Sequence, residues 1–306
     1  MIEDFAGGGS SIFSNRLDAD ESYLYHYTSA DTLAKILESK ALRMGPYSET
    51  NDPRETSEWS PRITLDSEDD VDGRPEEIAR LWLQIRDIRK GVKLGCFTLD
   101  AETEQTGWEF PFDRGWARAR MWHQYANDHA GACLVFDRAE RERSLQTLSV
   151  TNAFAWHHGK VVYEDTAFGE FGSRLSFSST ELRAGNSEER LAQIVKEHRS
   201  DLFFKKNRDW QSENEYRHSA ISNSESEFVP ITSSLVGIVL GADFPHTELC
   251  VLNDRLHRGG FTGVKGAYLS WRNGMPHLVG DTDSLGRRWL VLPPVGPFDD
   301  DGGSKS

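Results

Sequence analysis

Cysteine is scarce in this chain of 306 residues, and long apolar runs are absent. The three cysteines, Cys96, Cys133 and Cys250, lie far apart and form no Cys-x-x-Cys motif, which favours a reduced, cytoplasmic compartment. No apolar stretch approaches the ~20 residues that a helix needs to span a bilayer. The first residues, MIEDFAGGGSSIF, lack the basic and apolar regions of a secretory signal. We therefore expect a cytoplasmic protein without a membrane segment.

Positive charge is also in short supply. Lys and Arg number 35 against 49 Asp and Glu, and the net charge of −14 argues against broad, charge-driven binding to nucleic acids or anionic membranes. A local basic groove remains compatible with the sequence, because Arg114, Arg118 and Arg120 cluster. The hydrophobic fraction is only 37%, but nine residues are Trp and apolar runs recur along the whole length. This composition indicates a globular protein rather than a disordered one.

Several signature motifs are missing as well. The chain contains no Walker loop, no Gly-x-Gly-x-x-Gly after a strand and no Gly-x-Ser-x-Gly, so no sequence motif supports phosphotransfer or serine hydrolysis. His123 and His129 are six residues apart, not the four that would place two imidazoles on one helix face, and His157 and His158 are adjacent. We therefore expect no metal site.

Hydrophobic periodicity predicts a single mixed α+β domain over residues 21–296, with insertions at about 56–90 and 165–204. Residues 1–20 are expected to be a flexible segment and 297–306 a disordered tail. The chain has no internal repeat. The predicted strands include 23–27, 41–44, 92–99, 132–136, 214–221 and 235–241, and the predicted helices are 29–38, 76–89, 115–130 (ended by Gly131) and 186–204.

Two carboxylates and an arginine stand close together in Trp210-Gln211-Ser212-Glu213-Asn214-Glu215-Tyr216-Arg217. On a strand, Glu213, Glu215 and Arg217 would share one face, with the two carboxylates ~6–7 Å apart at the backbone. Such a pair can stabilise an oxocarbenium-like centre and orient a nucleophile, while Arg217 holds Glu215 ionised or binds a phosphate. The alternative is the solvated face of an edge strand.

A histidine ends the first predicted strand in Leu24-Tyr25-His26-Tyr27-Thr28-Ser29. His26 beside Thr28 and Ser29 can hydrogen-bond ribose or diphosphate oxygens. A structural histidine followed by a helix N-cap explains the same residues equally well. Further on, Asn51-Asp52-Pro53 is typical of an Asx-type turn, which matters for function only if it lies over the same cleft.

Aromatic and polar residues alternate densely from Arg120 to His129. Trp122, Tyr125 and His129 recur on one helical face, a stripe that more often serves packing than ligand binding. We expect Trp122 to pack in the core. Tyr125 or His129 could instead line a cleft and stack on a base or a nicotinamide ring.

The set YHYTS, NDP, MWHQYANDHAG and W-x-x-E-x-E-Y-R, in this order over residues 23–221, resembles the mainly bacterial family called domain of unknown function 2971. The opening is also similar to ADP-ribosyltransferases, including those that modify DNA. That resemblance implies a split β-sheet core of ADP-ribosyltransferase type with inserted helices and loops, and NAD as a substrate without a metal.

The resemblance also implies site residues. His26 would bind the adenosine ribose of NAD with Tyr27, Thr28 and Ser29 beside it, and Tyr125 would be an aromatic cover. Glu215 would be the catalytic glutamate, Glu213 its partner carboxylate and Arg217 a further cofactor-binding residue. The E-x-E pair is typical of members that modify arginine side chains.

Three hypotheses follow from these motifs. The first is an NAD-dependent ADP-ribosyltransferase, such as a toxin or phage-defence effector with a macromolecular acceptor, protein or nucleic acid, and a neutralising partner protein. The second is a nucleic-acid-processing enzyme that uses Glu213, Glu215 and a histidine. The third is a non-catalytic module that binds a nucleotide or a peptide.

Overall fold

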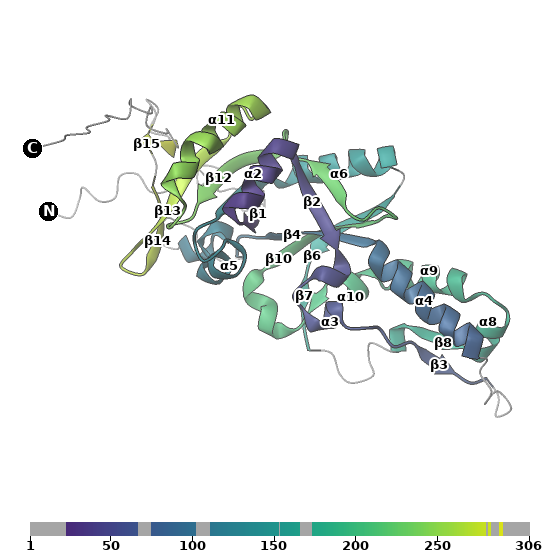
Figure 1. Cartoon of the computed structure of the whole chain (residues 1–306). Coiled ribbons are helices and arrows are strands. Elements are labelled where there is room, and N and C mark those ends of the chain that lie inside the picture. Colours follow the sequence, from purple (N-terminus) through teal and green to yellow (C-terminus); the bar gives the residue numbers. More distant parts are fainter. Residues whose placement is uncertain are drawn as a thin grey trace, which may run out of the picture. The chain divides into compact units, whose positions relative to one another are not determined.

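The computed structural model describes residues 23–66, 75–101, 111–152, 154–165, 173–279, 281–282 and 288–289. The chain divides into two compact units, each built from segments that are distant in sequence. Unit 1 consists of Met1–Ala41, Asp100–Arg141 and Ile231–Ser306, and unit 2 of Leu42–Leu99 and Glu142–Pro230. Many elements of both units are labelled in Figure 1.

Unit 1 is built on a mixed sheet in which β1, β5, β12, β13 and β14 are neighbours in that order. All neighbouring pairs run antiparallel except β12 and β13, which are parallel. The strands are β1 Tyr23–Thr28, β5 Ala132–Asp137, β12 Leu235–Leu240, β13 Lys265–Arg272 and β14 Met275–Val279, with the short pair β15 Asp281–Thr282 and β16 Arg288–Trp289. The helices are α2 Ala30–Ser39, α5 Ala119–Tyr125 and α11 Leu249–Gly259, with short 3₁₀ turns η4 Pro111–Asp113, η5 Gly115–Ala117 and η7 His246–Glu248.

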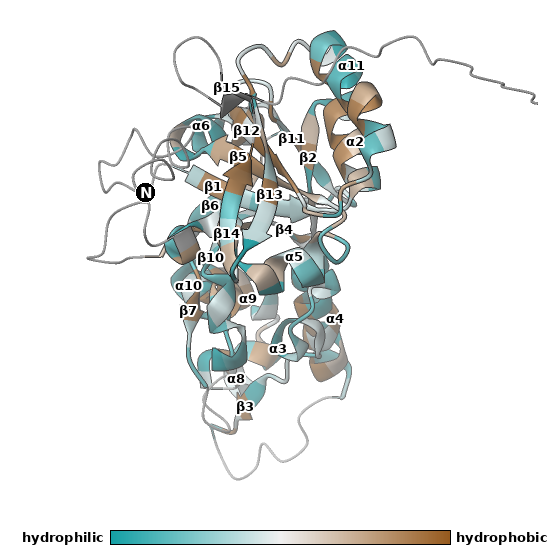
Figure 2. Ribbon diagram, turned by 90° about the vertical axis from the view of Figure 1, so that its left-hand side faces the viewer, coloured by the Kyte–Doolittle hydropathy of each residue, from teal (hydrophilic) through white to brown (hydrophobic). Residues whose placement is uncertain are grey.

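The central strands β5 and β12 of unit 1 are apolar and almost entirely buried, as expected for strands that are covered on both faces. In β5 the five residues from Ala132 to Phe136 are all buried, and β5 and β12 carry the brown of hydrophobic residues in Figure 2. Helix α2 begins after Ser29 and buries Leu33, Ile36 and Leu37, as its periodicity predicts. It contacts α11, and the two helices lie side by side in Figures 1 and 2.

The helix predicted over residues 115–130 is wrong in its length. Helix α5 covers only Ala119–Tyr125, because Asn127, Asp128 and His129 adopt left-handed backbone angles (φ 47°, 52° and 69°) that a right-handed helix cannot continue. Gly131 is predicted to end this helix, but the structure requires a glycine there for another reason. A Cβ atom there would lie 2.2 Å from the carbonyl oxygen of Thr28, so only glycine permits this close approach of two backbones.

Unit 2 is built on a second set of paired strands. Strand β10 pairs antiparallel with both β4 and β6, β4 also pairs with β2, and β2 neighbours β11. The strands are β2 Ala41–Pro46, β4 Val92–Thr98, β6 Ala155–Lys160, β10 Glu215–Ile221 and β11 Glu227–Pro230, with two short parallel pairs, β3 Arg62–Thr64 with β8 Ser176–Ser178 and β7 Val162–Tyr163 with β9 Lys205–Lys206.

Four helices of unit 2 each bury one face against a core of aliphatic and aromatic side chains, among them Tyr47, Trp59, Leu81 and Phe203; these helices are α4 Pro75–Gly91, α8 Ser179–Arg183, α9 Ser187–Glu197 and α10 Arg199–Phe203. The helix predicted over residues 186–204 is interrupted at His198, where the backbone leaves helical geometry (φ −108°, ψ 20°). The unit also contains α3 Pro53–Thr56, with α6 Arg138–Asn152 at the boundary of the units and 3₁₀ turns η2 Tyr47–Glu49 and η6 Arg208–Glu213.

The expected α+β class is confirmed, because the described chain combines mixed sheet pairing with helices from several segments. An ADP-ribosyltransferase-type core stays a prediction, as do the boundaries of the predicted single domain. The predicted flexible segment 1–20 and tail 297–306 lie outside the described residues.

Candidate functional site

The carboxylate motif begins in a turn and continues into a strand of unit 2. Glu213 is the last residue of η6, Asn214 follows in a left-handed conformation (φ 45°, ψ 56°), and β10 starts at Glu215. The prediction that Glu213 shares a strand face with Glu215 is therefore wrong. Asn214 stabilises the bend, because its backbone oxygen accepts from the amide of Leu99 at 2.9 Å and its side-chain amide donates to the carbonyl of Leu99 at 3.2 Å.

Strand β10 is not an edge strand, so the predicted alternative of a solvated face is also wrong. Arg217 stands opposite Cys96 of β4 and Gly159 of β6 in the register. Glu213, Glu215 and Arg217 are 2%, 4% and 0% exposed. Burying charged groups costs free energy unless they are paired, so the contacts of these side chains decide how the motif is tolerated.

Arg217 is the centre of the cluster, with carboxylates on two of its edges. Its Nε and Nη2 donate to Oε1 and Oε2 of Glu215 at 2.7 and 3.1 Å, the two-pronged geometry that arginine forms with carboxylates. Its Nη1 donates to the carbonyl of Phe203 at 2.6 Å and lies 2.5 Å from Oε1 of Glu55 in an ion pair. The pairing with Glu215 agrees with the role predicted for Arg217 of holding that carboxylate ionised.

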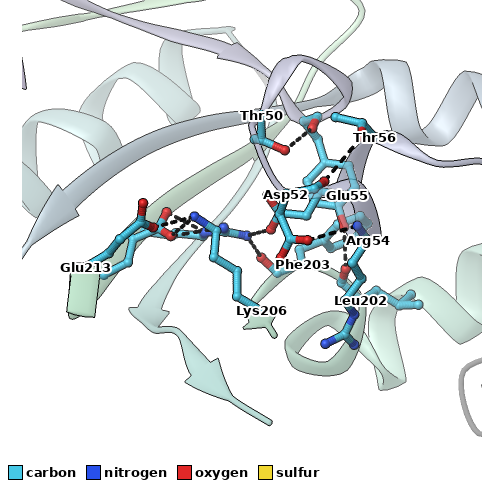
Figure 3. Close-up of polar contacts among 12 residues, drawn as sticks. Thr50, Asp52, Arg54, Glu55, Thr56, Leu202, Phe203, Lys206 and Glu213 are labelled. Carbon is cyan, nitrogen blue, oxygen red and sulfur yellow. Dashed lines mark hydrogen bonds and ion pairs between the residues drawn. The ribbon is translucent and has the colours of Figure 1, made fainter. Parts of the chain in front are cut away.

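Lys206 brings the two glutamates of the motif together. Its Nζ lies 2.7 Å from Oε2 of Glu213 and 2.8 Å from Oε2 of Glu215. The ammonium group also lies 5.2 Å from the ring centroid of Trp210, within the range of a cation–π contact. In Figure 3 Lys206 lies between Glu213 on one side and the segment with Asp52 and Glu55 on the other. Glu213 and Glu215 are thus neighbours through a shared cation rather than through strand periodicity.

Glu215 and Glu55 differ in the direction in which the protein shifts their pKa values. Burial works to raise the pKa of Glu215, but Arg217 and Lys206 outweigh it and lower that pKa to about 2. Burial raises the pKa of Glu55 above its ordinary value, although Arg217 opposes this shift. With Glu55 protonated, the cluster would hold two carboxylates against two cations. The protein therefore keeps Glu215 ionised, and of these two carboxylates Glu55 takes up a proton more readily.

Two members of the cluster, Glu55 and Lys206, are absent from the sequence-based prediction. Glu55 is fully buried, but it follows a turn motif and carried no signal of its own. Lys206 belongs to a basic run, Lys205-Lys206-Asn207-Arg208, which sequence alone would assign to solvent. The Asn51-Asp52-Pro53 motif offered the one clue, because Pro after Asp predicts the start of a helix, and Glu55 lies in its first turn.

The predicted NAD-binding residues around β1 lie in unit 1. Side chains alternate along a strand, and Tyr25 and Tyr27 pack in the core of unit 1 with Trp122, so His26 and Thr28 lie on the other face of β1. Tyr27 is 5% exposed and donates through its hydroxyl to the carbonyl of Gly115 at 2.5 Å. His26 is partly exposed.

Ser29 has the structural role that the sequence offered as an alternative. It is the N-cap of α2, where its hydroxyl oxygen accepts from the amide of Thr32 at 3.2 Å. Its hydroxyl also lies 3.0 Å from Oγ1 of Thr32. Binding of NAD by His26, Tyr27, Thr28 and Ser29 stays a prediction.

The aromatic run of α5 is divided between core and surface of unit 1. Trp122 is fully buried, meets the ring of Tyr27 edge to face at 5.2 Å, and donates to the carbonyl of Trp116 at 2.7 Å, which confirms its predicted packing role. Tyr125 is partly exposed, and its hydroxyl accepts from Nε2 of Gln124 at 3.2 Å. His129 stacks on Trp122 with ring centroids 6.1 Å apart. Tyr125 as an aromatic cover stays a prediction.

Among the residues that the structure describes, neither a metal-binding group of side chains nor the cavity of unit 1 coincides with the glutamate cluster. Within the described residues, no group of His, Cys, Asp and Glu side chains could hold a metal ion. A cavity of about 370 Å³ lies in unit 1, lined by residues of α11 and β13 such as Leu252, His257 and Lys265, and it contains none of the predicted site residues. In the part of the chain that the structure describes, no helix has both the length and the apolar character that crossing a bilayer requires.

A family model described as protein of unknown function (DUF2971) matches residues 121–218. The match supports the expected family. The matched segment runs from α5 into β10, so it includes Lys206, Glu213, Glu215 and Arg217, and it covers less than half of the chain. It gives no support for the resemblance to ADP-ribosyltransferases. No curated protein and no solved structure matches this chain.

Proposed function

We propose that this protein is an ADP-ribosyltransferase-like enzyme that transfers ADP-ribose from NAD to a macromolecular acceptor. The observation that carries the proposal is the buried carboxylate of Glu215 held by Arg217 and Lys206, whose charges lower its pKa to about 2 against the effect of burial. A fixed carboxylate is what a positively charged glycosyl transition state requires. A cytoplasmic toxin or phage-defence effector with a neutralising partner is the biological setting of the proposal.

The proposed reaction breaks the bond between C1′ of the ribose and the nicotinamide nitrogen. Nicotinamide leaves with the bonding electrons, positive charge develops at C1′, and an acceptor nucleophile forms the new bond and loses a proton. Glu215 would stabilise the developing charge by holding the ribose hydroxyl. Glu213, joined to Glu215 through Lys206, would position the acceptor.

The energetics of the cluster favour a functional role over a purely structural one. Buried ion pairs contribute little to stability, since apolar residues of similar volume are often equally good or better in the same place. Five charged side chains nevertheless meet here from separate segments: Glu55, Lys206, Glu213, Glu215 and Arg217. Stability alone does not account for gathering these groups in the interior of unit 2.

The chemistry places one demand on the cluster. An ionised carboxylate offers about four lone-pair positions. In Glu215 they are used by Nε and Nη2 of Arg217, by Nζ of Lys206, and by the thiol of Cys96. Lys206 is the donor that is shared with Glu213, so a shift of Nζ entirely to Glu213 would free one acceptor position on Oε2 of Glu215 for a ribose hydroxyl, while Nη2 of Arg217 stays bound.

The same saturation favours a second candidate, a non-catalytic module that binds a nucleotide or peptide. Glu215 is only 4% exposed, and each of its oxygens already accepts from a cation. In such a module the cluster would hold the sheet of unit 2 in shape for binding elsewhere. This candidate predicts ligand binding without turnover, and no loss of binding when Glu215 is replaced by Gln.

Nicotinamide release from NAD distinguishes the two candidates. The full chain is incubated with NAD and a cell lysate as the source of acceptors, alongside Glu215→Gln and a control, Glu227→Gln. Glu227 is 5% exposed in unit 2, is bonded by Ser222 and lies outside the cluster. We expect release by the wild type and the control, and a fall of about 100-fold or more in Glu215→Gln. Equal release by all three proteins would sink the proposed role of Glu215.

Absence of release from the wild type is the other adverse outcome. If NAD or another nucleotide binds in calorimetry, remains intact with every lysate, and binds Glu215→Gln equally well, the binding module is the correct function. A folded Glu215→Gln protein is verified by circular dichroism, because loss of activity through unfolding would otherwise mimic loss of a catalytic group.

A further inference from the structure

Glu55 is presented to the cluster by a single helical turn that is fixed from several sides. Asp52 caps this turn, α3, by accepting from the amide of Arg54 at 2.9 Å, and Pro53 occupies the first helical position. Both Asp52 and Glu55 are fully buried. Figure 3 shows Glu55 next to this cap. The Asp52 cap and Pro53 thus fix the backbone of α3, which carries the carboxylate of Glu55.

Two arginines connect α3 to other helices of unit 2. Arg54 donates from Nη2 to the carbonyl of Asp201 in α10 at 3.1 Å, and Arg89 of α4 donates to the carbonyl of Glu55 itself at 2.6 Å. The Arg89 guanidinium also lies over the ring of Trp59 at 5.4 Å. The backbone of Glu55 is therefore located by α4 and α10, independently of β10.

The side chain of Glu55 has one strong contact. Its Oε1 lies 2.5 Å from Nη1 of Arg217, while Oε2 has no hydrogen-bond partner among the described residues. A fully buried carboxylate with half of its acceptor capacity unused is costly. The contact with Arg217 offsets part of this cost, and it is the ion pair that the structure gives to the side chain of Glu55.

We propose that Glu55 is a positioning residue of the glutamate cluster, which fixes the Nη1 end of Arg217 so that the opposite edge of the guanidinium holds Glu215. The proposal rests on the proposed function for its catalytic consequence, but not for its structural one. The guanidinium group is planar and rigid, so fixing one end sets the direction of the other. Without Glu55, the Nη1 end would keep only the carbonyl of Phe203, at 2.6 Å.

Three variants test this role. Glu55→Gln keeps the shape and removes the charge, Glu55→Asp keeps the charge and shortens the reach, and Glu227→Gln is the matched control for losing a buried carboxylate elsewhere in unit 2. The first measurement is nuclear magnetic resonance of the Arg217 Nε–H group, assigned by its disappearance in Arg217→Lys. This group donates to Glu215, so its hydrogen exchange reports directly on the contact that Glu55 is proposed to maintain.

We expect the exchange of the Arg217 Nε–H group to accelerate about tenfold or more in Glu55→Gln and to be unchanged in Glu227→Gln. Glu55→Asp should give an intermediate rate, because it retains the ion pair at greater distance. An unchanged rate in folded Glu55→Gln would overturn the proposal. If Glu55→Gln does not fold, Glu55→Asp takes its place in the measurement, and an unchanged exchange rate in that variant would overturn the proposal equally.

The catalytic consequence is measured separately, as nicotinamide release. We expect Glu55→Gln to lower kcat on the order of tenfold to a hundredfold with little change in the KM for NAD, because a misdirected guanidinium weakens stabilisation of the transition state rather than binding. Faster exchange in the variant with no release by the wild type would contradict the proposed function and leave the positioning role intact. Release with an unchanged kcat in folded Glu55→Gln would overturn the catalytic role of Glu55 and leave the proposed function intact.

Discussion

The two units use their motif residues in opposite ways. In unit 1 the motif side chains Tyr27, Ser29 and Trp122 find partners in nearby structure, as a buried hydroxyl, a helix cap and a packed ring. In unit 2 the motif side chains Glu215 and Arg217 are charged, buried and joined to charges from other segments. Tyr27 and Trp122 are buried as Glu215 and Arg217 are, but the first pair is stabilised mainly by apolar contact and the second by matched charge.

This difference indicates that the buried charges of unit 2, rather than the packed residues of unit 1, are the better candidates for a functional role. Burial of aromatic rings contributes to stability directly, so the role of Trp122 is complete once its packing is known. Buried charges contribute little net stability and lose much when one partner is removed. The free energy of unfolding should therefore respond differently in the two regions to a single substitution, to a second substitution that compensates the first, and to pH.

The largest effect is expected from Arg217→Met, which leaves the buried carboxylates of Glu55, Glu213 and Glu215 with Lys206 alone. We expect the free energy of unfolding in urea to fall by about 3–5 kcal/mol. Neutralising Glu55 and Glu215 to Gln in the same chain should restore most of this loss, because the uncompensated charges are then gone. A loss below about 1 kcal/mol in Arg217→Met would show that water reaches the cluster and would remove the contrast between the units.

Smaller effects of opposite sign are expected from the two glutamates as pH changes. The lowered pKa of Glu215 makes its stabilisation present above the ordinary carboxyl value of 4.5 and lost as the pH falls towards about 2. From that shift the contribution at neutral pH is about 3 kcal/mol. The wild type should therefore gain stability relative to Glu215→Gln as the pH rises from 3 to about 5.

Glu55 has a raised pKa, so its stabilisation is full below 4.5 and is lost as the pH rises through the raised value. The wild type should lose stability relative to Glu55→Gln over the range above 4.5. Tyr47, Arg54, Arg89, Lys206, Glu215 and Arg217 are the charged or titratable groups that act on this carboxyl group or its neighbours. Urea unfolding at a series of pH values measures both differences, and a common direction for the two variants would refute the distinct charge states assigned to them.

The smallest effect is expected in unit 1, from Ser29→Ala. Loss of the hydroxyl that accepts from the amide of Thr32 should lower the free energy of unfolding by about 1 kcal/mol, and Ser29→Asp should restore it by capping α2 again. Thermal unfolding measures the three proteins side by side. A stable Ser29→Ala protein would argue against the cap as the reason for Ser29 and return weight to its predicted contact with NAD.

Local sequence patterns were sufficient to predict those helices and strands whose conformation is set by residues close to them in the sequence. Strands β5 and β12 are predicted from their apolar runs, and helix α2 from its N-cap and its apolar periodicity. Each of these signals is contained in a short stretch of the sequence. Prediction failed for the end of α5, because the polar residues 127–129 that follow it take left-handed angles, and for Glu213, which lies before the strand. In both places a turn chosen by the surrounding structure overrides the local pattern.

The sequence by itself determined the α+β class, most of the strands and the packing role of Trp122, because these follow from periodicity and side-chain volume along short segments. It offered the pairing of Arg217 with Glu215 as one of two roles, and the structure shows that pairing. Only the tertiary structure decided that Glu55 and Lys206 complete the cluster. These residues are more than 150 and about 10 positions from Arg217 in the sequence. Their charges meet because α3, β9 and β10 pack together in unit 2, and no local pattern encodes that encounter.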